Sequence, residues 1–274
     1  MPATSHAGRP GRGFRNEADP GDGETSPMTS RVKSPLIFGL LALAAWQAIV
    51  MVADIPEYLL PAPSAIVANV DRTLAVQLAV TFVEALIGFL IASALAFGCA
   101  IMFVRFNTLE EGLFPIAIAV KTTPIVAVAP LLVIWLGTGW WSKIVAVILI
   151  CFFPVLVNAV KGLKAADAEY RELFQTLGAS RAQEFRKLRI PYCLPYLFSA
   201  LKISSSLAIV GAIVGEFVGA TQGLGYLIMV SSAHLETATL FAAIAAAALA
   251  GILLFYIIGW TEERVIFWHS GNLE

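Results

Sequence analysis

The chain has 274 residues, of which 58% are hydrophobic and only 14% are charged. An ordinary soluble domain carries about a quarter charged residues, so this composition indicates a membrane protein. The net charge of −1 argues against nucleic-acid binding, which needs a clustered excess of Lys and Arg. The three cysteines are an odd number without C-x-x-C spacing, so they predict buried free thiols and no disulfide or metal site.

Residues 1–33 are rich in Gly, Pro, Ser, Thr and charged residues, with almost no large apolar side chains. Such a segment cannot bury enough apolar surface to offset the entropy lost on ordering, so we expect a disordered cytoplasmic tail. It is too long and too acidic for the region that precedes the apolar core of a secretory signal. Met28 stands just before the first apolar run, so a wrongly assigned start site could account for the residues upstream of it.

Several apolar runs approach or exceed the roughly 20 residues that a helix needs to cross a bilayer. These runs are residues 36–53, 74–104, 113–136, 144–160, 194–218 and 238–260. We therefore expect an all-α polytopic membrane protein in which residues 34–274 form one domain with six transmembrane helices.

The basic residues are distributed unequally between the two sets of loops. Most of them precede the first run, lie between the fourth and fifth runs, or follow the sixth, whereas the opposite loops contain only Arg72 and Lys143. Because cytoplasmic loops carry the excess of Lys and Arg, both termini are predicted to be cytoplasmic. His234 is then expected outside.

The longest predicted cytoplasmic segment, residues 162–191, has the pattern of two short helices joined at a corner. Residues 166–177 are compatible with a helix, and Gly178 follows where a left-handed C-terminal cap favours glycine. Ser180 and Gln183 have the spacing of a capping box and predict a second helix, which should end before Pro191. Such a corner can serve as a docking surface for another protein.

The run ELFQTLGASRAQEFRKLRIP resembles the Glu-Ala-Ala loop of the permease subunits of bacterial ABC importers. Glu172 matches the acid of that loop and Gly178 its glycine, while Leu173 and Phe174 replace its two alanines and make the corner bulkier. The residues that the resemblance implies for coupling to the ATPase are Glu172, Gly178, Ala179, Ser180, Leu188, Ile190 and Pro191.

The resemblance extends over residues 59–269 through the stretches LPAPSAI, TPIVAVAPLLVIWLGTG, FFPVLVNAVKGL and GEFVGATQGLGYLI. They look like the sulfonate, nitrate, taurine and pyrimidine-precursor branch of these permeases. The resemblance implies the fold of a type I ABC importer permease in the bacterial inner (plasma) membrane. It also implies three partners: a second permease copy, an ATPase dimer and an extracytoplasmic solute-binding protein.

The chain lacks the G-x-x-x-x-G-K-[ST] motif, so it cannot hold nucleotide by a P-loop. We therefore expect a transport subunit that is not an enzyme and binds no cofactor, with ATP and Mg on the partner ATPase. An intramembrane hydrolase is disfavoured because His6, His234 and His269 are all predicted outside the bilayer. An oligomeric channel, or a secondary transporter not coupled to ATP, stays open as the alternative, although a passive pore would not require the docking corner.

Polar side chains inside the apolar runs are candidates for lining the substrate path. They are Glu84, Lys121, Asn158, Ser204, Ser205 and Glu216. Each has a structural alternative: Glu84 could be a protonated or hydrogen-bonded packed acid, Lys121 could extend toward the cytoplasmic face, and the serines could bond the preceding turn. Glu216 is expected near the external end, where it would face water or a partner.

Small residues recur at every fourth position near the end of the fifth run, at Gly211, Gly215, Gly219 and Gly223. This spacing lets helix backbones approach closely. The contact lies either within one subunit or across a permease dimer.

The substrate is predicted from the resemblance of residues 194–228, which look closer to permeases for thiamine-pyrimidine precursors and riboflavin-like compounds than to those for sulfonates. An acid at Glu84 would also disfavour an anionic solute, because like charges repel strongly in a low dielectric. We therefore expect a neutral or cationic heterocycle, with a sulfonate-, nitrate- or taurine-type solute as the alternative.

Overall fold

The computed structural model describes residues 28–267, and within that range every regular element is a helix. Residues 1–27 of the predicted tail lie outside the described range, and α1 (Met28–Val52) begins inside the stretch assigned to that tail. The chain divides into two units between Ala45 and Trp46, so most of α1 belongs to the first unit and all later helices to the second.

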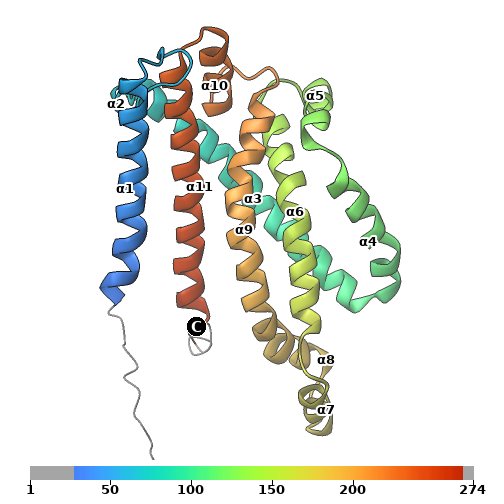
Figure 1. Cartoon of the computed structure of the whole chain (residues 1–274). Helices are drawn as coiled ribbons and strands as arrows, with labels where there is room; N and C mark the ends of the chain where they lie inside the picture. The colour runs from blue at the N-terminus through green and yellow to red at the C-terminus, as the bar shows by residue number, and fades with distance from the viewer. Residues whose placement is uncertain (1–27, 268–274) are drawn as a thin grey trace, which may run out of the picture. The chain divides into compact units, whose positions relative to one another are not determined.

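Four helices of the second unit are long and apolar enough to cross a membrane. They are α3 (Arg72–Arg105), α6 (Trp140–Lys164), α9 (Ile190–Glu216), which continues the helical residues from Arg181, and α11 (Thr237–Val265). Figure 1 shows α6, α9 and α11 running side by side while α3 crosses them obliquely. The all-α membrane class is therefore confirmed.

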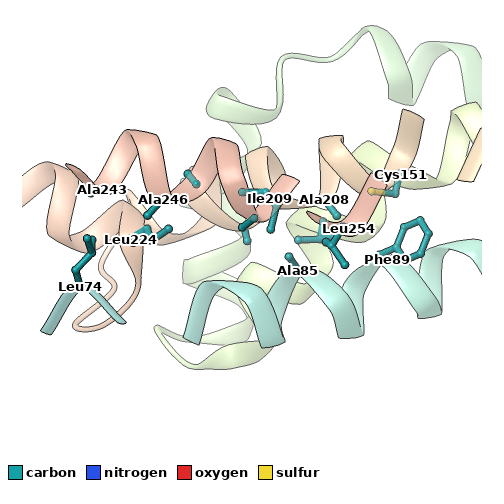
Figure 2. Packing of buried hydrophobic residues seen from close by; sticks show 14 of the residues in the cluster. Leu74, Ala85, Phe89, Cys151, Ala208, Ile209, Leu224, Ala243, Ala246 and Leu254 are labelled. Carbon is teal, nitrogen blue, oxygen red and sulfur yellow. The ribbon is translucent and has the colours of Figure 1, made fainter. Parts of the chain in front are cut away.

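The core of this bundle is built largely from small side chains. In Figure 2, Ala85 and Phe89 of α3 face Ala208 of α9 and Leu254 of α11, and all four are buried. Along α11 the buried residues are mostly alanines at helical spacing, which lets neighbouring backbones approach closely. Such close packing matters in a bilayer, because the hydrophobic effect does not drive helices together in lipid. The packing of α6 against α3 and α9 forms the centre of the unit.

The expected third span is not one straight helix. α4 (Asn107–Thr122) and α5 (Ile125–Leu136) are bent by 98° at a short break. Thr123 has an extended ψ of 125°, as the residue before a proline prefers, and Pro124 itself lacks an N–H. The described residues thus contain four long apolar helices, or five if the bent pair is one span, and a count of six stays a prediction.

Short helices mark the two ends of the bundle. α2 (Pro63–Ala68) and α10 (Leu224–Ala233) lie at one end, and α7 (Ala168–Thr176) and α8 (Arg181–Glu184) lie at the other (Figure 1). α10 is apolar but has only 10 residues, which is too short to cross a bilayer.

Candidate functional site

The corner between α7 and α8 is determined by two caps, the first of which is centred on Gly178. This glycine ends α7 with a φ of +71°. Its N–H donates to the carbonyl of Gln175 at 2.9 Å, and the N–H of Ala179 donates to that of Phe174 at 2.9 Å. These are the two hydrogen bonds of a Schellman motif, so the predicted left-handed cap is confirmed.

The second cap is the predicted capping box at the start of α8. Ser180 Oγ accepts from the Gln183 N–H at 3.3 Å, and Gln183 Oε1 accepts from the Ser180 N–H at 2.8 Å. The two caps satisfy backbone groups that helix ends otherwise leave unpaired. The corner therefore has a definite conformation that is encoded within a few residues of sequence.

The prediction that the second helix ends before Pro191 is wrong. α8 continues through a π-helical turn, η1 (Phe185–Arg189), directly into α9. In this turn the Ile190 N–H donates to the carbonyl of Phe185, one residue further back than in an α-helix. The wider turn accommodates the proline ring, which would clash with a carbonyl in a regular α-helix. Arg189 and Glu184, five residues apart, form an ion pair of 2.9 Å across it.

The corner presents apolar side chains to solvent. Leu177, directly before Gly178, is 75% exposed, and Leu173 is also exposed. Glu172, Gly178 and Ser180 are exposed beside them, which suits a docking surface. The remaining residues of the expected coupling set are less accessible: Leu188 is buried, and Ala179, Ile190 and Pro191 are half-buried. Sequence reasoning did not identify Leu177 as part of this surface, although an apolar residue directly before a capping glycine is a usable signal.

A second group of predicted residues meets inside the bundle, at the beginning of α10. The first N–H groups of a helix have no partner within it, and here side chains of α3 and α9 accept from them. The three hydrogen bonds are Gly223 N–H to Gln77 Oε1 at 2.6 Å, Leu224 N–H to Thr81 Oγ1 at 2.7 Å, and Gly225 N–H to Glu216 Oε2 at 2.5 Å.

Glu216 is the centre of this cluster. Its Oε1 accepts a hydrogen bond of 2.7 Å from Thr81 Oγ1, and the residue is only 1% exposed. The expectation that Glu216 faces water or a partner is therefore wrong, because its side chain is buried among helices of its own chain. A Cβ atom at Gly223 or Gly225 would collide with the Glu216 side chain, so both positions require glycine.

Glu84 of α3 lies in the same cluster. It is 1% exposed, and its carboxyl lies beside that of Glu216. Its Oε2 has no hydrogen-bond partner among the described residues. Gln77, Thr81 and Glu84 are spaced four and three residues apart and share one face of α3. This spacing could have identified Gln77 and Thr81, which sequence reasoning missed.

Lys143 also approaches the cluster rather than lying in an external loop as predicted. It belongs to the first turn of α6, is 5% exposed, and donates from Nζ to the carbonyl of Thr138 at 2.7 Å. Its charge is close enough to act on both Glu84 and Glu216. A cation therefore accompanies the two buried acids.

The other candidates for the substrate path bond mainly to their own helices or their neighbours. Asn158 Nδ2 donates to the carbonyl of Pro154 at 2.8 Å, and Ser205 Oγ donates to that of Lys202 at 2.7 Å. Ser204 is buried between α9 and α6, with its Oγ 3.5 Å from the carbonyl oxygen of Cys151. Lys121 is exposed, and its Nζ lies 4.8 Å from the centre of the Phe153 ring. A path-lining role for these residues stays a prediction.

The glycine stripe of α9 packs within one subunit. A Cβ at Gly215 would lie 2.9 Å from Lys143 Cα, and one at Gly211 would lie 3.0 Å from Val147 Cα, so both glycines face α6. Gly219 is in the turn after α9, where its φ is +74°. Of the two interpretations left open by the sequence, close contact within the subunit is the one that describes Gly211 and Gly215.

The described residues thus form a bundle of long apolar helices with an exposed, capped corner at one end. The family model described as "Binding-protein-dependent transport system inner membrane component" matches residues 86–267, and the chain belongs to this family of ABC importer permeases. It is thus a non-enzymatic inner-membrane subunit. Among the described residues, no group of three or more His, Cys, Asp or Glu could hold a metal ion.

Three relatives each match most of the chain. The formylaminopyrimidine transport permease protein ThiX of Halalkalibacterium halodurans is 34% identical over 86% of this chain and 96% of its own length. The riboflavin transport system permease protein RibX of Chloroflexus aurantiacus is 34% identical over 84% of this chain and 88% of its own. The putative aliphatic sulfonates transport permease protein SsuC of Bacillus subtilis is 28% identical over 86% of this chain and 87% of its own length.

The fold is also similar to that of a solved permease. The MetNI methionine ABC transporter, solved in inward-facing conformations, matches with a TM-score of 0.53 and 20% identity, over 72% of this chain and 94% of the other. At this identity the similarity shows the fold of a type I ABC importer permease and nothing more about function.

Proposed function

We propose that this chain and a second copy of it form the translocation path of an importer for a thiamine-pyrimidine precursor or a riboflavin-like heterocycle. An extracytoplasmic binding protein delivers the solute, and a separate ATPase subunit hydrolyses ATP. Two relatives named for formylaminopyrimidine and riboflavin are each 34% identical, whereas those named for sulfonates and taurine are 28% identical. This difference supports the heterocycle. The charge of Glu84, which was expected to repel an anionic solute, does not support this choice, because Glu84 is buried.

The observation that carries the coupling half of the proposal is the continuity between the docking corner and α9. The helical residues run without a break from Arg181 to Glu216, and α9 packs against α6, α3 and α11. A displacement of the corner by the ATPase dimer is therefore passed to the centre of the bundle. ATP drives this change only if the ATPase binds one conformation of the permease better than the other.

Uptake into liposomes tests the proposal. The permease is reconstituted with its ATPase and binding protein, and the uptake of formylaminopyrimidine, riboflavin, taurine and an alkanesulfonate is compared. We expect ATP-dependent uptake of one of the two heterocycles, and none with a non-hydrolysable ATP analogue. Tight binding of the alkanesulfonate or of taurine by the partner binding protein would overturn the choice of substrate, and uptake without ATP would overturn the coupling.

A further inference from the structure

A cavity of about 790 Å³ opens between the last turns of α3 and the segment formed by α7, α8 and η1. Its lining is strongly basic, with five arginines against two acids. The arginines are Arg105, Arg171, Arg181, Arg186 and Arg189. Of the two acids, Glu184 already pairs with Arg189, so Glu172 is the one acid of the lining that remains to balance the other four arginines. The cavity therefore has a net positive charge.

Two features show that hydrogen-bond donors in this cavity lack protein partners. Arg171 Nε is buried and has no partner among the described residues. The exposed Arg105 guanidinium lies 5.6 Å from the centre of the Phe106 ring and forms no hydrogen bond or ion pair with the described residues. A buried donor without an acceptor, such as Arg171 Nε, is costly, so a ligand with acceptor oxygens would be favoured here.

The lining is also amphipathic. Ile101 and Val104 belong to the end of the membrane-spanning α3, and Phe106 and Phe185 add aromatic surface. The cavity thus lies where a span ends, with apolar side chains beside the arginines. A small inorganic anion would use only the arginines, whereas a lipid would use both parts.

We propose that this cavity binds the headgroup of an anionic phospholipid. Phosphate oxygens match the planar fork of arginine donors, and basic pockets between helices on the cytoplasmic side of a membrane suit anionic headgroups. The acyl chain lies along Ile101 and Val104, and the phosphate accepts from Arg171 and Arg105. Because these arginines come from α7 and the end of α3, the lipid joins the docking corner to a spanning helix.

Native mass spectrometry of the full-length, delipidated permease tests the proposal. Dioleoyl phosphatidylglycerol is titrated against dioleoyl phosphatidylcholine, which has the same acyl chains without the net charge. We expect phosphatidylglycerol to bind more tightly, and Arg171→Gln and Arg105→Gln each to weaken it about fivefold or more. Arg171→Lys should retain most of the binding, since it keeps the charge. The matched control is Arg264→Gln, which removes an arginine from the end of α11 outside the cavity and should change nothing.

Three outcomes would overturn the proposal. Equal binding of the two lipids, or an equal loss in Arg264→Gln, would mean that the lipid contacts are not specific to this cavity. Complete displacement of phosphatidylglycerol by millimolar inorganic phosphate would identify a small-anion site. Loss of the bound lipid when the ATPase subunit is added would assign the basic surface to that protein instead. Thermal unfolding of each variant, measured alongside, excludes misfolding as the cause of a loss.

Discussion

Thr81 Oγ1 of α3 donates a hydrogen bond of 2.7 Å to Glu216 Oε1 of α9, and the same oxygen accepts one of 2.7 Å from the Leu224 N–H of α10. Thr81 is fully buried and Glu216 is 1% exposed. One hydroxyl group therefore joins three helices away from water, where an unpaired polar group is costly. This pair therefore links the beginning of α10 to α3 and α9.

We predict that Thr81→Val loosens the beginning of α10. The substitution preserves the shape of the side chain but leaves the Leu224 N–H without its acceptor and removes the Thr81 donor from Glu216 Oε1, which costs about 1–3 kcal/mol. Hydrogen exchange of the first α10 amides should accelerate about tenfold or more. The control is Ser205→Ala, whose hydroxyl bonds only the preceding turn of its own helix. Unchanged exchange in α10 of Thr81→Val would show that the cluster does not hold this helix.

We predict that a charge introduced at Gly178 impairs docking without unfolding the protein. A Cβ at this position meets nothing within 4 Å, so Gly178→Ala costs only the left-handed backbone, about 1–2 kcal/mol. Gly178→Asn tolerates that backbone and should retain the ATPase, whereas Gly178→Asp adds a charge at the expected contact and should lose it. The measurements are co-purification with the ATPase and the midpoint of thermal unfolding. Wild-type ATPase association and uptake in Gly178→Asp would contradict the coupling assignment.

The close approach of α9 to α6 predicts a large effect at Gly215. A Cβ there would lie 2.9 Å from Lys143 Cα, so Gly215→Ala should destabilise the protein by about 1–3 kcal/mol. At Gly251 of α11 the nearest atom to a new Cβ is Ser206 Cα at 3.9 Å, an ordinary contact. Gly251→Ala is therefore the matched control and should be neutral or stabilising, because alanine favours helix. Tryptophan fluorescence during heating measures both, and equal midpoints would refute the tight packing.

The orientation in the membrane is tested by cysteine labelling. Exposed His234 caps the end of α10 and exposed Gln183 lies in α8, and these two helices are at opposite ends of the bundle (Figure 1), so each residue can report one side. In a background where Cys99, Cys151 and Cys193 are replaced by alanine, a membrane-impermeant maleimide should label His234→Cys on intact cells. Gln183→Cys should react only after permeabilisation. The reverse pattern would place both termini outside, against the distribution of basic residues.

Local features of the chain were predictable from neighbouring residues. The left-handed cap at Gly178 and the capping box at Ser180 depend on backbone and side-chain groups within a few positions, so their sequence pattern was sufficient. The membrane class followed from composition, because lipid requires long apolar helices whatever their arrangement. The resemblance to the permease family was also visible in the sequence, because it depends on short motifs such as the one that contains Gly178 and Ser180.

The continuation of α8 into α9 and the bend at Pro124 were not predictable with the same rules. A proline in the sequence predicts the end of a helix. At Pro191, however, a π-helical turn accommodates the proline, whereas at Pro124 the chain bends by 98°. The local rule that a proline ends a helix therefore does not distinguish a wider turn from a break.

The buried cluster was decided by tertiary structure alone. Thr81 and Glu216 are 135 positions apart, and only the packing of α3, α9 and α10 brings them together. From the sequence, Glu84, Lys143 and Glu216 were polar residues in or near apolar runs, without a known depth or partner. Composition and local pattern determined that this protein crosses a membrane and presents a capped corner. Both features depend on each segment by itself, because every apolar helix contacts lipid and every cap forms between neighbouring residues. Which polar groups are buried, and what they bond, depends on distant helices and was decided only when the chain was folded.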